Sequence, residues 1–164
     1  MQRNPRRAAE QLDQVDRVLL AELRADARAS YAQLARQVGL SPPSVQDRVR
    51  RLERRGVLRG YLAVVGAEEA GLPVSALVSI YQTDSAERDE VATRLGKIDQ
   101  IEDCWAVAGD EAFVVKVRVA DVAALEAAIA SIQRTKGVAR TRTTVVLSTR
   151  WEARPVPLPE EPTA

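Results

Sequence analysis

The chain has 164 residues, no histidine and a single cysteine, Cys104, which excludes Ser-His-Asp and Cys-His catalysis, zinc sites built from His or several Cys ligands, and any intrachain disulfide. Its net charge of +1 combines two opposed halves, because residues 1–66 carry 13 Lys and Arg against 7 Asp and Glu, whereas residues 67–164 carry 11 against 16. A basic half joined to an acidic one is expected when one half meets nucleic acid and the other meets something else, and the length allows one or two small domains.

The N-terminal residues 1–11 are polar and basic without a hydrophobic period, so we expect a flexible arm there. From Leu12 onward apolar residues recur at helical spacing through Leu19 and Leu23. Asp13 and Asp16 fall in the first turn, where carboxylates favour the positive end of the helix dipole. This helix is expected to support the next two.

Two short helices joined by a tight turn are predicted over residues 30–60, SYAQLARQVGLSPPSVQDRVRRLERRGVLRG. The apolar stripe of the first helix ends at Gly39, where a helix C-terminus favours a left-handed residue. Ser41 can cap the second helix with its hydroxyl, and Pro42 fits a first turn that needs no N–H.

The second of these helices has an apolar side that can pack against the core and a polar side that can face solvent or DNA. On a helical wheel Val45, Val49 and Leu52 lie together. The opposite side and its flanks carry Pro43, Ser44, Gln46, Asp47, Arg50, Arg51 and Arg54. Arg can pair with guanine or phosphate and Gln with adenine, so such a helix suits the major groove of DNA. A lone arginine-rich helix would more simply be a solvated face, but the complete helix-turn-helix frame favours DNA binding.

The rest of the chain reads as a second domain behind a linker. Residues 57–65 form a short apolar stretch suited to a wing or hinge. This stretch completes a predicted helix-turn-helix domain at residues 12–66. Residues 67–74 are predicted to be a linker from their Gly, Pro and charge content. The proline-rich residues 154–164 are expected to be a disordered tail.

Residues 75–153 alternate strand and helix. Strands are predicted at 75–81, 102–108, 112–119 and 140–148, and helices at 85–97 and 122–133. This βαββαβ order predicts an α+β ferredoxin-like sandwich, four antiparallel strands covered on one face by two helices. The open sheet face is expected to be rich in Val, Ile and Trp105, and since a large exposed apolar surface invites another subunit, we expect at least a homodimer.

The first half resembles the Lrp/AsnC family, the feast/famine transcriptional regulators, in register over roughly residues 1–65. The resemblance rests on Leu12-Asp13, Asp16-Arg17, Leu19-Leu20, Leu34-Ala35, Val38-Gly39-Leu40-Ser41-Pro42, Arg48-Val49-Arg50-Arg51-Leu52-Glu53, Gly56-Val57-Leu58 and Gly60-Tyr61. It implies a sequence-specific regulator that binds double-stranded DNA through a winged helix-turn-helix. The second domain would bind a small effector, usually an amino acid, and dimerise through its sheet. Many members form higher homo-oligomers.

The predicted site residues fall into two groups. DNA contacts are expected from Tyr31, Gln33, Ser41, Pro43, Ser44, Gln46, Asp47, Arg50, Arg51 and Arg54. Among these, Ser44, Gln46, Asp47 and Arg50 are the expected base readers, and Tyr31, Gln33, Arg51 and Arg54 are expected to contact phosphates. The resemblance places effector binding at Ala108, Gly109, Asp110 and Glu111. The alternative for that turn is a simple hairpin loop. Many members carry a second acid and a tyrosine where this chain has Ala112 and Phe113.

Two other functions stay open at this point. An architectural, nucleoid-compacting protein would share every feature above and differ only in having little sequence preference. Some proteins of the same two-part organisation are sirohaem decarboxylases, which use basic and histidine side chains, and the missing histidine and intact arginine helix argue against that enzyme here. No segment is apolar enough to span a membrane. We expect a cytoplasmic, nucleoid-associated protein with no enzymatic activity, cofactor or metal.

Overall fold

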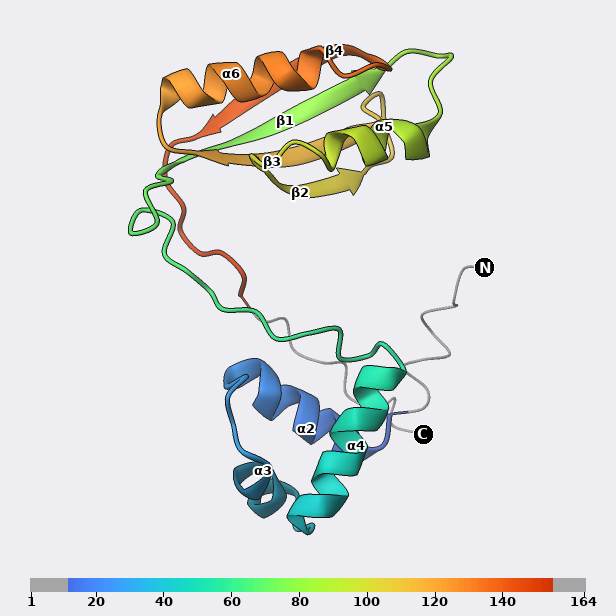
Figure 1. Ribbon diagram of the computed structural model, residues 1–164, viewed down its shortest axis with the longest axis vertical. Coiled ribbons are helices and arrows are strands. Elements are labelled where there is room, and N and C mark those ends of the chain that lie inside the picture. The colour runs from blue at the N-terminus through green and yellow to red at the C-terminus, as the bar shows by residue number, and fades with distance from the viewer. Residues whose placement is uncertain (1–11, 155–164) are drawn as a thin grey trace. The chain divides into compact units, whose positions relative to one another are not determined.

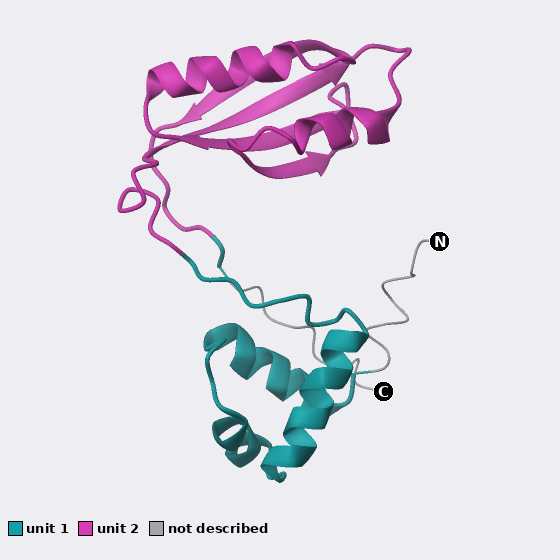
Figure 2. Ribbon diagram, in the orientation of Figure 1, with its two compact units in different colours: residues 1–64, 153–164 teal, residues 65–152 magenta. Residues whose placement is uncertain are grey.

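The computed structural model describes residues 12–154, which form a helical unit and an α+β unit (Figure 1). The boundary between these units falls between Val64 and Val65, and the second unit extends to Glu152 (Figure 2). The expectations for an arm at residues 1–11 and for the tail beyond Arg154 lie outside the described residues. No helix in the described part of the chain is long and apolar enough to cross a membrane.

The first unit consists of three helices, α2 (Gln14–Ala25), α3 (Tyr31–Val38) and α4 (Pro42–Arg54). Each begins directly after a side-chain cap, because Asp13, Ser30 and Ser41 accept hydrogen bonds from backbone N–H groups that the first helical turn leaves unpaired. Their apolar stripes meet in one core. That core contains Leu19, Leu23, Leu34, Ala35, Val45 and Val49.

No wing follows these helices: the described chain forms no strand over residues 57–65, so of the wing and the hinge that the sequence left open there, only the hinge agrees with the structure. Leu62 and Val64 are 90% and 83% exposed. A strand needs a neighbour to take up its backbone N–H and C=O groups, and the helical unit offers none. The stretch is instead a connection. Beyond it, turns closed by backbone hydrogen bonds such as Leu72 N–H to Ala67 O, 2.8 Å, lead into the second unit.

The second unit has the predicted βαββαβ order. Its elements are β1 (Val74–Gln82), α5 (Arg88–Leu95), β2 (Ile101–Ala106), β3 (Phe113–Val119), α6 (Val122–Gln133) and β4 (Val138–Val146). The four strands lie in the order β2-β3-β1-β4, and every pairing is antiparallel. The α+β fold class and the four-stranded sheet are therefore confirmed. Helix α5 begins three residues later than predicted, because a turn closed by Ala86 N–H to Thr83 O, 3.0 Å, precedes it.

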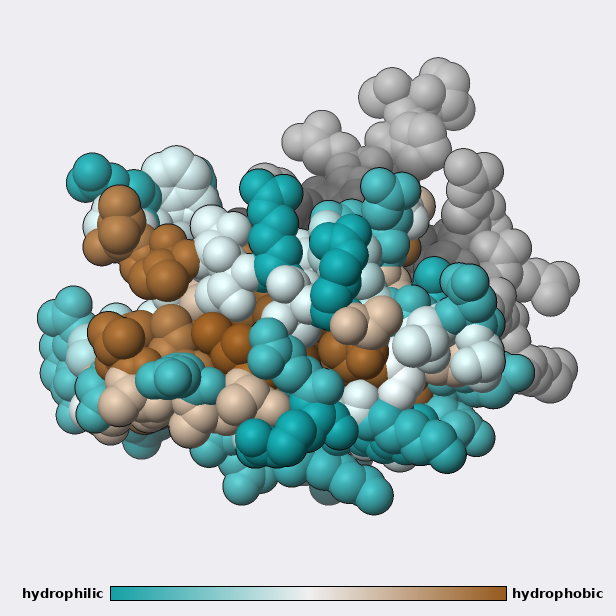
Figure 3. All heavy atoms as spheres, turned by 90° about the horizontal axis from the view of Figure 1, so that it is seen from above, coloured by the Kyte–Doolittle hydropathy of each residue, from teal (hydrophilic) through white to brown (hydrophobic). Residues whose placement is uncertain are grey.

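Helices α5 and α6 cover one face of this sheet (Figure 1). Viewed from above, the α6 side carries a band of hydrophobic side chains (Figure 3). A shallow groove there is lined by Val122, Leu125, Glu126, Ile129, Ala130 and Gln133. Val122, at the start of α6, is 74% exposed.

The open face of the sheet differs from the expected surface rich in valine and isoleucine. Side chains alternate along a strand, and in this sheet Val78, Ile80, Val115 and Val117 all point into the core. Residues of opposite parity face outward. They include Leu77, Tyr81, Lys116, Arg118, Arg140 and Arg142, with Trp105 from β2. The open face is therefore largely polar, with Trp105 47% and Leu77 38% exposed.

Candidate nucleic-acid interface and effector turn

Helix α4 presents most of the predicted DNA-reading residues to solvent. Val45, Val49 and Leu52 are fully buried, which fixes the rotation of the helix about its axis. On the outward side Pro43, Ser44, Asp47, Arg50 and Arg54 are exposed and Gln46 is half-buried. Within the described chain neither Arg50 nor Arg54 has an ion-pair or hydrogen-bond partner for its guanidinium group. Two unpaired arginines therefore lie on the face predicted to meet DNA.

The starts of α3 and α4 bring further predicted residues to the surface. Ser41 caps α4 by accepting from Ser44 N–H at 3.3 Å, and the two hydroxyl oxygens lie 2.8 Å apart. On α3, Ser30 N–H donates to Gln33 Oε1 at 2.7 Å, and Gln33 N–H donates to Ser30 Oγ at 3.2 Å. This capping box leaves the Gln33 amide NH₂ as a donor, which suits a phosphate. Tyr31 beside it is 37% exposed.

The turn between α3 and α4 depends on a left-handed residue. Gly39 has φ 67°, in the region that disfavours a side chain, and it ends α3 as predicted. Leu40 N–H then donates to Ala35 O at 3.1 Å. Leu34 and Ala35 are buried beneath this turn, so the turn fixes how α4 leaves α3.

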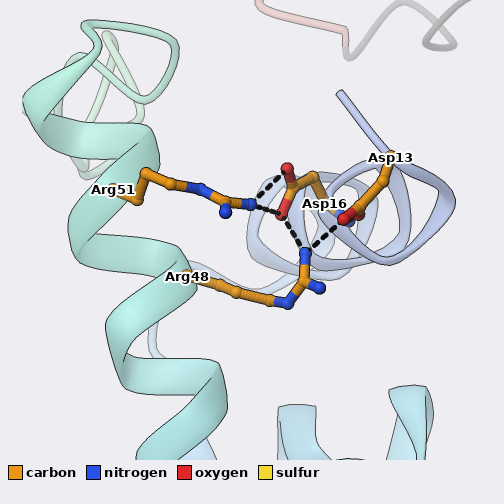
Figure 4. Close-up of polar contacts among 4 residues, drawn as sticks. All are labelled: Asp13, Asp16, Arg48 and Arg51. Carbon is orange, nitrogen blue, oxygen red and sulfur yellow. Dashed lines mark hydrogen bonds and ion pairs between the residues drawn. The ribbon is translucent and has the colours of Figure 1, made fainter. Parts of the chain in front are cut away.

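Two other arginines of α4 are bound to α2 (Figure 4). Asp16 is 0% exposed, yet it carries a carboxylate. Arg51 Nη2 donates to both of its oxygens, at 3.0 and 2.9 Å, and Arg48 Nη1 donates to Asp16 Oδ1 at 2.9 Å. Arg48 Nη1 also bonds Asp13 Oδ2 at 2.5 Å. A buried carboxylate needs such partners, because burial removes its hydration.

The charges of this cluster shift the titration of its outer members. Partial burial of the Asp13 carboxyl tends to raise its pKa, but hydrogen bonds from Arg48 and from Asp16 N–H outweigh this, so the pKa lies below the ordinary value. Hydrogen bonds to Asp13 and Asp16 raise the pKa of Arg48. Asp13 and Arg48 therefore stay ionised at neutral pH.

Sequence reasoning did not find this cluster. The signal was present, since Asp13 and Asp16 are three residues apart on one helix and Arg48 and Arg51 are three apart on another. Residues at that spacing share a helix face, so each pair could face the other. The phosphate contact predicted for Arg51 falls on a side chain that is directed at Asp16 instead of at the outward face of α4.

The predicted effector turn connects β2 to β3. Val107 N–H donates to Ala112 O at 3.3 Å and Ala112 N–H to Ile80 O at 2.8 Å, which closes the turn and ties it to β1. Gly109 has φ 145°, within the range that favours glycine. The turn thus presents backbone groups to solvent at a fixed place beside the sheet.

Within that turn Glu111 is held by side chains of the open sheet face. Ala108, Gly109 and Asp110 are exposed, and Glu111 is half-buried. Tyr81 OH donates to Glu111 Oε1 at 3.0 Å. The guanidinium carbon of Arg140 lies 3.4 Å from the centre of the Tyr81 ring.

The titration of Glu111 reflects these neighbours. A hydrogen bond from its own backbone N–H, the bond from Tyr81 and the charges of Arg142 and Arg140 hold the pKa of this carboxyl below its ordinary value. Ala112 and Phe113 are buried, at 4% and 2% exposure. The positions at which this chain departs from the family pattern therefore face the core and offer no polar group to a ligand.

Comparison with known proteins identifies both parts of the chain. Residues 12–53 match the AsnC-type helix-turn-helix domain, and residues 74–156 match the Lrp/AsnC ligand binding domain. The HTH-type transcriptional regulator LrpA of Mycobacterium tuberculosis is 46% identical over 145 residues, covering 88% of this chain and 96% of that protein. The leucine-responsive regulatory protein of Escherichia coli is 35% identical over 145 residues, covering 87% and 88%.

A solved structure extends the likeness to three dimensions. The feast or famine regulatory protein from M. tuberculosis complexed with L-methionine has a TM-score of 0.84 to this chain at 44% identity, covering 90% of this chain and 99% of that one. All three of these relatives are named as regulators, and the resemblance seen in the sequence is confirmed.

Proposed function

The chain belongs to the Lrp/AsnC family of transcriptional regulators, and from this premise we propose that it recognises specific double-stranded DNA through the outward face of α4, without catalysis. The observation that carries the proposal is the division of α4 into a buried side and an exposed side with the unpaired Arg50 and Arg54. Base edges would be read by Ser44, Gln46, Asp47 and Arg50.

Phosphates would be contacted from the edges of the same surface. Arg54 offers an unpaired guanidinium, Gln33 offers its amide NH₂, and Tyr31 offers a half-exposed ring and hydroxyl. Ser41 and Pro43 would shape the start of the helix that enters the groove. These contacts fix the register on DNA without reading its sequence.

The test is binding of the purified protein to its own upstream promoter DNA and to unrelated DNA of equal length at physiological salt. A specific regulator should bind the promoter DNA at least about a thousandfold more tightly than the unrelated DNA. An operator for a dimer should contain half-sites one helical turn apart, or a multiple of it. Equal, salt-sensitive affinity for promoter and unrelated DNA would support the architectural alternative.

A small effector is proposed for the turn Ala108–Glu111, with an amino acid as the ligand class. The methionine complex of a relative supports this class. Glu111 and the backbone carbonyls of the turn can accept hydrogen bonds from an ammonium group. Arg142 on β4 is an exposed cation, and its charge helps to lower the pKa of Glu111. We assign the carboxylate of the amino acid to Arg142, because a guanidinium binds a carboxylate with two parallel N–H donors.

The effector assignment is tested by calorimetric titration of the full protein with each common amino acid. Arg142→Gln should weaken binding of the responsive amino acid at least about tenfold, since it removes a charge-assisted pair. Lys97→Gln, which removes an exposed cation elsewhere in the same unit, should leave binding unchanged. Equal losses in both variants would exclude the assignment, and no binding to the wild-type protein would exclude the effector.

Assembly into a homodimer and a higher homo-oligomer is proposed as well. Trp105 and Leu77 on the open sheet face are the exposed apolar side chains that support it. Sedimentation velocity on the full chain should show a dimer or larger species, and a monomer throughout the micromolar range would refute it. The proposed place of action is the cytoplasm, at the nucleoid.

A further inference from the structure

Four arginines of α4 divide into two pairs with different surroundings. Arg50 and Arg54 point outward without an ion-pair partner in the described chain, whereas Arg48 and Arg51 both reach Asp16. The side chains of Arg48 and Arg51 are nevertheless 26% and 44% exposed, so neither is enclosed by the fold. The two pairs differ in that only Arg48 and Arg51 donate hydrogen bonds to the Asp16 carboxylate.

We propose that Asp16 is a positioning residue that withholds Arg48 and Arg51 from DNA phosphates, and so limits the sequence-independent part of DNA binding. The proposal rests on the proposed function, because it requires that α4 lie against DNA. Asp16 would touch no DNA, since its side chain is 0% exposed, and would act only through the two arginines (Figure 4).

The geometry makes the two arginines poor phosphate ligands. A phosphate could bind Arg51 in its present place only beside Asp16, whose two oxygens lie 3.0 and 2.9 Å from Nη2. Swinging Arg51 away would leave the buried carboxylate with fewer donors, which low-dielectric surroundings oppose strongly. Arg48 is held twice, by Asp16 and by Asp13.

The consequence for DNA binding follows from counterion release. Each phosphate neutralised by an arginine steepens the dependence of log affinity on log salt by about 0.9 and strengthens binding to every sequence alike. Two withheld arginines therefore keep the affinity for unrelated DNA low, while base contacts by Arg50 are untouched. Because this term is common to all sequences, the ratio of specific to non-specific affinity is unchanged, and the absolute affinity for competing unrelated DNA is lower as a result.

The decisive variant is Asp16→Asn, which keeps the size of the side chain and removes its charge. We expect the salt slope on unrelated DNA to steepen by about 0.9 to 1.8, corresponding to one or two new phosphate contacts. Affinity for promoter and unrelated DNA should rise by the same factor, so the ratio between them should stay unchanged. Glu22→Gln is the matched control, since it removes one negative charge from the same helix, α2, without releasing an arginine, and it should leave the slope unchanged.

A second step identifies the cations responsible. Adding Arg48→Gln and Arg51→Gln to Asp16→Asn should return the slope to the wild-type value. In the wild-type background Arg51→Gln should leave the slope unaltered, whereas Arg54→Gln should reduce it by about 0.9. The comparison of Arg51→Gln with Arg54→Gln tests the proposal even if Asp16→Asn fails to fold. Thermal unfolding followed by circular dichroism shows whether Asp16→Asn is folded.

The outcomes are distinct. Unchanged slopes with equal loss of affinity for both DNAs in Asp16→Asn would give Asp16 a purely structural role and overturn the proposal. A reduced slope in Arg51→Gln would overturn it too, because Arg51 would then already contact phosphate. Failure of the wild-type protein to bind any DNA would overturn the proposed function itself, and is recognised before any variant is made.

Discussion

Replacement of Gly39 by alanine should destabilise the first unit through backbone strain alone. Gly39 has φ 67°, and a Cβ placed on it would meet no atom within 4 Å. A left-handed backbone costs a non-glycine residue about 1–2 kcal/mol, and alanine recovers part of this, about 0.4–1 kcal/mol, by restricting the unfolded chain. We therefore expect Gly39→Ala to lower the free energy of unfolding by about 1 kcal/mol.

Two other glycines provide matched comparisons. Gly96 has a right-handed backbone with φ −63°, and its added Cβ would lie 3.5 Å from the nearest atom, so Gly96→Ala should stabilise by about 0.4–1 kcal/mol. Gly137 has φ 98°, and its Cβ would lie 2.7 Å from Val91 Cγ2 and 2.9 Å from the Ala86 Cβ. Strain and overpacking together should cost Gly137→Ala about 2–4 kcal/mol.

Urea unfolding at fixed protein concentration distinguishes these effects. Trp105 and Trp151 both lie in the second unit, so tryptophan fluorescence follows that unit, whereas far-UV circular dichroism follows the helices of both. Gly39→Ala should shift only the dichroism transition, and Gly137→Ala should shift the fluorescence transition. If Gly39→Ala left stability unchanged or raised it, backbone strain would not be what reserves this turn for glycine.

Three further predictions concern recognition and titration. Arg50→Ala should lose about 1–3 kcal/mol of binding free energy on promoter DNA and little on unrelated DNA. Arg54→Ala should weaken binding to both DNAs equally in the same binding titration. Burial, followed by the bond to Glu53, raises the pKa of Tyr61 to about 12, so absorbance titration should show a late-ionising phenol that Tyr61→Phe removes. Its contribution to stability is present below pH 10 and lost between about 10 and 12. The lowered pKa of Asp13 has the opposite sign, so the stability advantage over Asp13→Asn should be complete above pH 3.8 and vanish as acid unfolding proceeds below it.

The helices of the first unit could be predicted closely because their signals are local. Gly39, Ser41 and Pro42 each act through their own backbone or the adjacent turn, and the structure places them as expected. The order of elements in the second unit followed from hydrophobic period in the same way. The sequence could not decide between a wing and a hinge at residues 57–65, because a strand depends on a partner segment and an apolar run does not indicate whether one exists.

The open sheet face shows a second limit of sequence reasoning. The strand Phe113–Val119, FVVKVRV, is apolar overall, and alternation decides that its odd-numbered residues enter the core and that Lys116 and Arg118 face outward. Those two cations are paired with Glu102 of β2 and with Glu152. Glu152 lies beyond the last strand, so its ion pairs with Lys116 and Arg118 of β3 could not be predicted from the sequence.

The arginines of α4 show why residue type and helical spacing together do not assign a contact. Arg51 and Arg54 are neighbours on the helix, and both were predicted to bind phosphate on that basis. Asp16 is buried on α2, and a buried carboxylate needs compensating cations, one of which is Arg51, which donates to both of its oxygens. On our proposal, counting the arginines on this exposed helix overestimates its phosphate contacts, because a neighbouring helix buries an acid that binds two of them. For this chain the salt dependence of DNA binding should reflect Arg54 and its neighbours at the edge of the surface, with Arg48 and Arg51 contributing nothing until Asp16 loses its charge.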